Sequence, residues 1–172
     1  MPFAAAIALD GPKGVGKTGT AARRAAHTVR LDRPGERTVI SNDFDLDTLP
    51  QGTILFDEWQ HLPQVWDSVR RSVDDGAPPG RFLLTGSATP VDAAGTHSGA
   101  GRILSLRMRP MGFHERRLST PTVKFSDLLY GQGGSVDEPR FETSAEIDGS
   151  TNVAVGDYAE AIAASGFPGI MA

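Results

Sequence analysis

The sequence predicts an α/β fold with a mainly parallel sheet, and three observations support this prediction. Short, continuously apolar runs such as "FAAAIAL" (residues 3–9) and "TILF" (53–56) are typical of strands buried on both faces of a parallel sheet. Segments with helical spacing of apolar residues alternate with these runs, as α/β folds require. A chain of 172 residues with 39% hydrophobic and 22% charged residues suits one globular domain with a buried core.

The first predicted elements follow from continuity and punctuation. The apolar run at residues 3–10 ends at a glycine and is expected to be the first strand. Residues 17–30 are rich in alanine and contain no breaker after Gly19, which predicts a helix. The segment "RTVISN" (37–42) carries three consecutive residues with high strand propensity or β-branching, so a second strand is expected there.

The middle of the chain gives the clearest helix. "GTILFDE" (52–58) is expected to be a third strand of the buried type. Residues 62–76 then predict a helix, because Pro63 stands near its start and Gly76 just past its end. The apolar residues at helical spacing in this segment are Leu62, Val65, Trp66, Val69 and Val73.

The later part of the chain mixes strands with polar segments. "RFLLTG" (81–86) predicts a fourth strand, and the glycine-rich segment that follows it predicts a loop. "RILSLRMRP" (102–110) alternates and predicts a fifth strand, with Leu104, Leu106 and Met108 on one face and Arg107 and Arg109 on the other. Residues 131–152 are polar and glycine-rich and predict a linker or insertion, and residues 155–166 predict a helix.

Composition excludes several classes of function. The net charge of −4 and the isoelectric point near 5.5 argue against nucleic acid as a partner. Without cysteine there are no disulfides, thiolate metal sites or cysteine nucleophiles, and the four histidines are too far apart in sequence for a local zinc motif. The longest apolar run has seven residues, too few for a membrane span, so a cytoplasmic protein is expected.

A phosphate-binding loop is predicted directly after the first strand. "GPKGVGKT" (11–18) fits the pattern G-x-x-x-x-G-K-[ST] between a buried strand and a predicted helix, although a glycine-rich turn without a ligand is the alternative. The glycines permit positive φ angles that turn backbone N–H groups toward a phosphate, and the helix N-terminus favours an anion. Lys17 is expected to reach the β- and γ-phosphates, and the Thr18 hydroxyl to bind Mg²⁺. The predicted nucleotide-binding residues are Gly11, Pro12, Lys13, Gly14, Val15, Gly16, Lys17, Thr18 and Gly19.

Two carboxylates end the third predicted strand. Asp57 and Glu58 come at the carboxyl end of "TILF", where ligands collect in open α/β sheets. Asp57 is expected to hold Mg²⁺ directly or through water, and Glu58 to orient and deprotonate an attacking water. An acidic pair in this position is often only solvated surface, but a phosphate loop upstream favours the catalytic interpretation.

Hydroxyls and arginines supply further candidates. Thr85, Ser87 and Thr89 follow the fourth predicted strand and are able to hydrogen-bond a lytic water or the γ-phosphate, the alternative being a polar turn. The arginines between residues 102 and 117 include one candidate arginine finger or form a charged strand edge. They are Arg102, Arg107, Arg109, Arg116 and Arg117. The segment "DFDLD" (43–47) has calcium-loop spacing but lacks the turn glycine and the final glutamate.

Taken together, these motifs resemble a known family. "GPKGVGKT", "TILFDEWQHLPQVWDSVRRSVDDG", "RFLLTGSATP", "GAGRILSLRMRPMGFHE" and "YAEAIAASGFPG" resemble prokaryotic AAA-type ATPases with an uncharacterised C-terminal domain, sometimes grouped near the STAND NTPases. The resemblance implies a three-layer α/β/α P-loop core of the ASCE class with strand order 5-1-4-3-2. It also implies that residues 11–18 are the Walker A motif, that Asp57 and Glu58 are the Walker B motif and that Ser87 is the sensor-1 residue.

The resemblance also sets the expected domains. A P-loop ATPase core is expected at residues 1–130, a linker or insertion at 131–152, and the start of a C-terminal helical element at 153–172. Members of the resembled family usually continue well past the "GFPG" position, so the chain is expected to be a fragment that lacks a second domain.

Mg²⁺-dependent ATP binding and hydrolysis is therefore the predicted function. Lys17, Glu58 and Ser87 are the predicted catalytic residues, with Thr18 and Asp57 as metal ligands. The preference for adenine rests on the resemblance, and the sequence contains no guanine-reading N-K-x-D element. Three alternatives stay open, namely a nucleotide-switched binding module with negligible turnover, a small-molecule kinase, and a nucleic-acid-stimulated ATPase. Besides ATP, an unidentified protein partner is compatible with the sequence.

Overall fold

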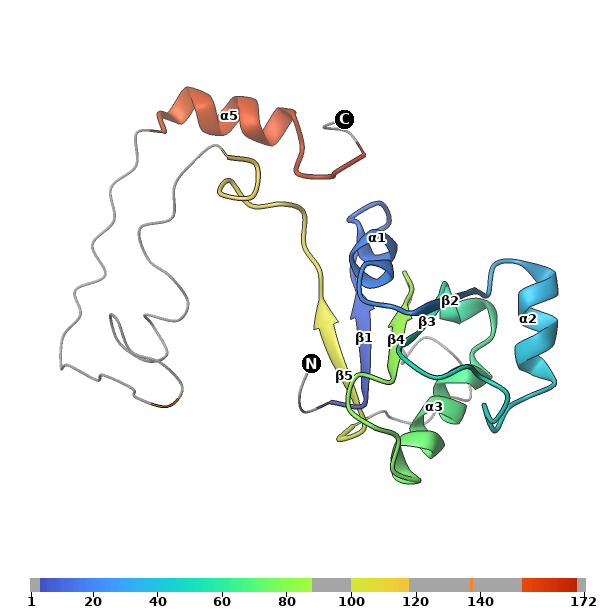
Figure 1. The fold of residues 1–172 in the computed structure, drawn as a ribbon. Coiled ribbons are helices and arrows are strands. Elements are labelled where there is room, and N and C mark those ends of the chain that lie inside the picture. Colours follow the sequence, from blue (N-terminus) through green and yellow to red (C-terminus); the bar gives the residue numbers. More distant parts are fainter. Residues whose placement is uncertain (1–3, 88–99, 118–136, 138–152, 170–172) are drawn as a thin grey trace. The chain divides into compact units, whose positions relative to one another are not determined.

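The structure is a computed structural model that describes residues 4–87, 100–117, 137 and 153–169 (Figure 1). The chain divides into two compact units, Met1–Arg109 and Pro110–Ala172. Apart from Asp137, the predicted linker at 131–152 lies outside the described residues, so the predicted domain boundaries stay a prediction. No helix in the described ranges is long and apolar enough to cross a membrane.

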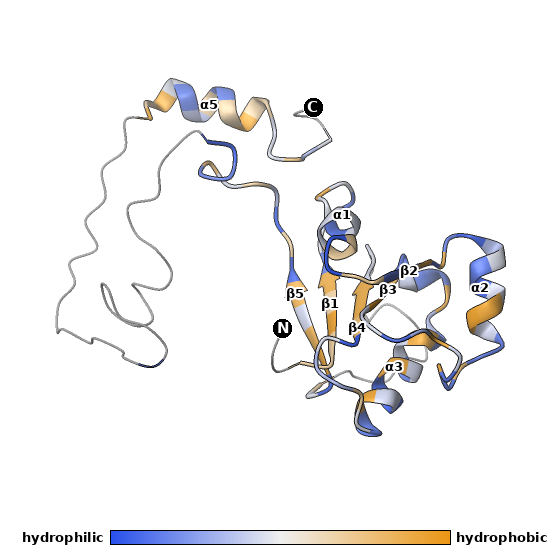
Figure 2. Ribbon diagram, in the orientation of Figure 1, coloured by the Kyte–Doolittle hydropathy of each residue, from blue (hydrophilic) through white to orange (hydrophobic). Residues whose placement is uncertain are grey.

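The first unit contains a five-stranded sheet whose strand pairs are all parallel. The strands are β1 (Ala6–Asp10), β2 (His27–Arg30), β3 (Ile54–Asp57), β4 (Phe82–Thr85) and β5 (Ile103–Arg107). Their order is β2-β3-β4-β1-β5, which is the predicted 5-1-4-3-2 counted from the other edge. The strands β3 and β4 are buried along their whole length, and Figure 2 shows the hydrophobic colour along β1 and β4. The predicted α/β fold is confirmed.

Helices cover both faces of this sheet. They are α1 (Lys17–Ala22), α2 (Pro34–Ser41) and α3 (Gln64–Asp74), with a short 3-10 helix η1 (Trp59–His61) after β3. On one face, α3 buries Val65 and Trp66 in a cluster that α2 joins through Ile40. On the other face, Ala21 of α1 packs on the central strands. The apolar residues of β1, β3 and β4 therefore alternate between two cores, which makes the three layers.

The predicted strand at residues 37–42 is wrong, because this segment belongs to α2. Pro34 occupies the first helical turn, where proline costs no hydrogen bond, and the Thr38 hydroxyl donates to the Pro34 carbonyl one turn back at 2.9 Å. Burial of Ile40 against the sheet then outweighs the weak strand preference of these residues.

The predicted helix at 17–30 is also too long. It ends at Ala22, and His27–Arg30 form the edge strand β2, whose Val29 pairs with Phe56 of β3. The His27 N–H donates to the Thr53 carbonyl at 3.1 Å. The sheet supplies these backbone groups with partners at residues 27–30, where histidine, threonine and valine are poor helix formers. The strands predicted at 3–10, 52–58, 81–86 and 102–110 and the helix at 62–76 are confirmed with shorter bounds.

The described part of the second unit is held together around α5 (Val155–Ala163), the helix predicted at 155–166. The ring of Tyr158 meets that of Phe113 edge-on at 5.0 Å between centroids. The Arg116 guanidinium donates to the Ala161 carbonyl at 2.8 Å, and the Asp157 carboxylate accepts the N–H that precedes the helix at 2.7 Å.

Candidate nucleotide-binding site

The glycine-rich loop connects β1 to α1 at the carboxyl end of the sheet. Gly11, Gly14 and Gly16 have φ angles of 136°, 83° and 98°, so the predicted positive dihedrals are present. A Cβ at Gly11 would lie 2.4 Å from the carbonyl oxygen of Met108, which leaves no room for a side chain. The exposed loop residues are Pro12, Lys13 and Gly14.

Lys17 is the first residue of α1, and its side chain reaches back to the start of the loop. Its side chain is buried and its Nζ donates to the carbonyl oxygens of Gly11 at 2.8 Å and Pro12 at 2.9 Å. None of the ion pairs within the described residues involves Lys17. A buried ammonium without a carboxylate partner retains an uncompensated positive charge, and an anion bound in the loop would neutralise it.

Asp57 joins the loop to two neighbouring strands. Its Oδ1 accepts a hydrogen bond from the Thr18 hydroxyl at 2.7 Å and another from the Thr85 hydroxyl at 2.6 Å. Asp57 and Thr85 are Cα partners in the β3–β4 ladder, and both side chains are buried. Charge-assisted hydrogen bonds of this kind fix the carboxylate and the Thr18 hydroxyl next to each other.

Glu58 follows Asp57 in a left-handed backbone conformation, with φ 56° and ψ 49°. This conformation is uncommon for a residue with a side chain and is found in sites where the surrounding structure enforces it. The Gln60 amide donates to Glu58 Oε2. Gln60 and Trp59 pack so closely on Gly86 that a Cβ there would lie 2.5 Å from Gln60 Oε1. The acidic end of β3 is therefore packed against the end of β4.

The other predicted site residues are three hydroxyl-bearing residues near the end of β4 and five arginines. Ser87 follows β4, is exposed, and lines a cavity of about 290 Å³ together with Asp10, Gly11, Pro12 and Arg107. The Thr85 hydroxyl, predicted to face a water or the γ-phosphate, donates to Asp57 instead. Thr89 lies outside the described residues.

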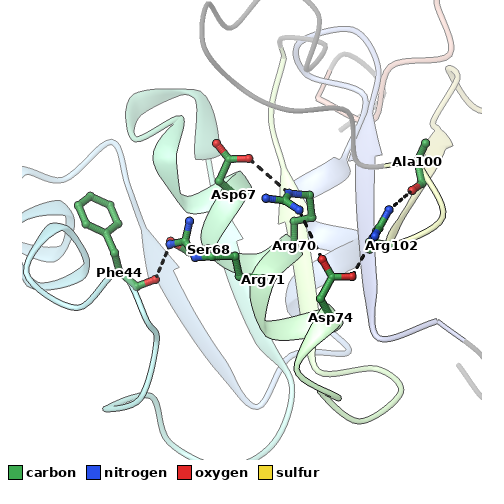
Figure 3. Close-up of polar contacts among 8 residues, drawn as sticks. All are labelled: Phe44, Asp67, Ser68, Arg70, Arg71, Asp74, Ala100 and Arg102. Carbon is green, nitrogen blue, oxygen red and sulfur yellow. Dashed lines mark hydrogen bonds and ion pairs between the residues drawn. The ribbon is translucent and has the colours of Figure 1, made fainter.

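The arginines of the predicted strip have different surroundings. Arg102 is in an ion-pair chain with Asp74, Arg70 and Asp67, with 2.8 Å between its Nε and Asp74 Oδ1 (Figure 3). Arg107 ends β5 and lines the cavity, whereas Arg109, Arg116 and Arg117 lie beyond that strand. Arg102 and Arg107 thus stand at opposite ends of one strand.

The oxygen atoms near the loop suit Mg²⁺. This ion binds one or two protein oxygens together with phosphate oxygens and water, and the hydrogen-bonded Thr18 hydroxyl and Asp57 carboxylate are such a pair. Among the described residues, no group of three or more acidic or histidine side chains is arranged to hold a metal ion. The "DFDLD" segment has another role, because Asp43 caps a turn by accepting hydrogen bonds from Thr48. The Thr48 side-chain hydrogen bond holds the pKa of Asp43 below its ordinary value.

Three residues of this site escaped prediction or received another role. Asp10 lines the cavity, and its Oδ1 is buried and accepts no hydrogen bond from the described residues. Gln60 contacts Glu58, and Thr85 contacts Asp57. The signal for Asp10 and Thr85 is the same: each is the polar residue that ends a continuously apolar strand.

Comparison with known proteins gives one family match. A family model described as an AAA domain matches residues 4–116, a range that contains the loop, all five strands and the residues around Asp57. No curated protein matches the chain.

Proposed function

We propose that this chain, which belongs to the AAA domain family, binds ATP with Mg²⁺ and hydrolyses the bond between the β- and γ-phosphates. Family membership supports a P-loop nucleotide-binding domain. The observation that carries the proposal is the link between Thr18 and Asp57 at 2.7 Å beside the buried ammonium of Lys17. It unites in one site a cation for the phosphates and two oxygens for a metal ion.

Each residue has a defined role in the proposed reaction. The loop N–H groups and Lys17 bind the β- and γ-phosphates, so that the ammonium exchanges carbonyl partners for phosphate oxygens. Thr18 and Asp57 hold Mg²⁺, which offsets charge on the phosphate oxygens when it is bound. Thr85 keeps the Asp57 carboxylate oriented toward Thr18 through the hydrogen bond at 2.6 Å.

Glu58 is the proposed base for the attacking water. It stands next to the metal-binding carboxylate, and the Gln60 amide restrains its side chain. The water loses its proton to the Glu58 carboxylate as its oxygen forms a bond with the γ-phosphorus, and the bond to the β–γ bridging oxygen breaks. Ser87 is proposed to hydrogen-bond the γ-phosphate from the end of β4.

The test measures phosphate release and nucleotide binding in parallel. Lys17→Ala should lose ATP binding, whereas Glu58→Gln should bind Mg²⁺–ATP as the wild type does and release phosphate at least about a hundredfold more slowly. Arg23→Ala is the control for loss of a positive charge, because Arg23 is exposed at the end of α1. Glu160→Gln on α5 is the control for the amide substitution.

Two results would contradict the proposal. If Lys17→Ala binds ATP like Arg23→Ala, the loop is not the nucleotide site. If the wild type binds ATP but releases phosphate no faster than Glu58→Gln, the domain is a nucleotide-controlled switch and not a hydrolase.

A further inference from the structure

A cavity of about 290 Å³ borders the first two residues of the phosphate loop. Its lining comes from the carboxyl ends of three strands, with Asp10 from β1, Ser87 after β4 and Arg107 from β5. The side chains that line the cavity therefore include a carboxylate, a hydroxyl and a guanidinium. The Nζ of Lys17, the group expected at the β- and γ-phosphates, is bonded to the carbonyls of the same two loop residues. The cavity is therefore bordered by the same two loop residues whose carbonyls hold the Lys17 ammonium.

Strand pairing fixes the backbone of Arg107 at this cavity. β5 pairs in parallel with β1, and Arg107 is the Cα partner of Asp10. The next residue, Met108, donates its N–H to the Asp10 carbonyl at 2.8 Å, and its own carbonyl lies directly against Gly11. The first residue of the phosphate loop is thus in direct contact with the backbone next to Arg107.

The charges in the cavity are unsatisfied on both sides. Asp10 Oδ1 is buried and has no donor among the described residues, which is costly for a carboxylate oxygen. Arg107 is exposed, and none of the ion pairs or hydrogen bonds within the described residues involves its guanidinium. Paired residues of parallel strands project from the same face of a sheet, so the side chains of Asp10 and Arg107 leave the sheet on the same face. The cavity is therefore lined by a carboxylate oxygen that lacks a donor and by a guanidinium that lacks an acceptor among the described residues.

Arg102 differs in each of these respects. It precedes β5 at the opposite end of the strand from the phosphate loop, and Asp74 holds it in an ion pair (Figure 3). Arg102 therefore joins β5 to α3, and it offers a matched arginine that lies away from the cavity.

From these observations we infer that Arg107 binds the γ-phosphate of the nucleotide held by its own chain, and that the nearby Asp10 carboxylate opposes this binding by repelling the γ-phosphate. The inference rests on the proposed nucleotide site and assigns it a residue that distinguishes ATP from ADP. A guanidinium forms paired, charge-assisted hydrogen bonds with phosphate, which suits Arg107 to this role. Asp10 does not contact the nucleotide in this arrangement and acts on it only through its charge.

The test compares the affinities for ADP and for AMP-PNP, a triphosphate analogue with a β–γ nitrogen bridge, in the full chain with Mg²⁺ by titration calorimetry. Arg107→Ala should weaken AMP-PNP binding by about tenfold to a hundredfold and leave ADP binding unchanged, because only the triphosphate has the group that Arg107 contacts. The AMP-PNP affinity of Arg107→Lys should lie between those of the wild type and of Arg107→Ala, since lysine keeps the charge but cannot form the paired hydrogen bonds of a guanidinium. Arg102→Ala should keep the wild-type ratio of the two affinities.

Asp10→Asn tests the effect of this carboxylate. Removal of this carboxylate should strengthen AMP-PNP binding relative to ADP, because the γ-phosphate loses a neighbouring like charge. A loss of AMP-PNP affinity in this variant would contradict the assigned role of Asp10.

The outcomes separate this inference from the proposed function. A wild-type chain that binds neither nucleotide contradicts the nucleotide site itself. A wild type that binds both, but keeps its ratio of affinities after Arg107→Ala or loses both affinities equally, overturns the role of Arg107 and leaves the site standing.

Discussion

Removal of the Thr85 hydroxyl tests whether Asp57 is held by the hydrogen bonds that the structure shows. Thr85→Val keeps the shape of the side chain but deletes the donor that lies 2.6 Å from Asp57 Oδ1. Thr85 is 1% exposed and Asp57 is 7% exposed, so water has little access to replace the lost donor. The substitution should therefore destabilise the first unit and loosen the carboxylate beside Thr18.

The magnitude follows from two opposing effects. A hydrogen bond to a charged acceptor contributes about 1.5–3 kcal/mol, while the additional buried methyl of valine returns about 0.8 kcal/mol. The free energy of unfolding should fall by about 1–2 kcal/mol, which at a typical urea dependence lowers the unfolding midpoint by about 0.5–1 M. Binding of Mg²⁺–ATP should weaken in the same variant.

Tryptophan fluorescence is a suitable assay, because both tryptophans of the chain are buried in the first unit. Trp59 and Trp66 lie 5.0 Å apart between ring centroids, so their emission reports unfolding of this unit. Thr28→Val on the exposed edge strand β2 is the matched control and should change stability by no more than about 0.5 kcal/mol. Equal midpoints for Thr85→Val and Thr28→Val would refute the reasoning.

The remaining predictions concern two glycines and one carboxylate. Gly11→Ala should abolish nucleotide binding and destabilise the chain by about 2 kcal/mol or more in urea unfolding, because its Cβ would meet the Met108 carbonyl. Wild-type binding and stability in this variant would show that the Met108 backbone moves away at little cost. Gly19→Ala, which has open space inside α1, should instead stabilise the chain by about 0.5–1 kcal/mol in the same assay, and a loss of stability would contradict the helical conformation. The Thr48 hydrogen bond lowers the pKa of Asp43 in the folded chain. The contribution of this hydrogen bond to the free energy of unfolding is therefore full above the unfolded pKa of about 3.9, and it disappears as the pH falls through the folded pKa. The stability difference between wild type and Asp43→Asn should shrink accordingly in urea titrations between pH 7 and pH 3, and a constant difference would oppose this assignment.

Local patterns were sufficient for much of the sheet and for the phosphate loop. The strands β1, β3 and β4 are continuously apolar because helices cover both faces, and this requirement is visible in the sequence itself. The loop is recognisable in the sequence because glycine is favoured where φ is positive and because the lysine of this motif binds the phosphates. The edge elements escaped prediction: residues 27–30 form a strand and residues 37–41 a helix because of backbone partners and packing that propensity does not encode.

The sequence by itself determined the α/β class, the phosphate loop and the position of Asp57 and Glu58 at the end of a buried strand, because each depends on residues adjacent in the chain. Only the tertiary structure decided which distant side chains meet. Parallel pairing of β3 with β4 brings the Thr85 hydroxyl to Asp57, and pairing of β1 with β5 brings Arg107 beside Asp10. Strand order and register govern such encounters, and they arise from packing of the whole sheet rather than from any one segment.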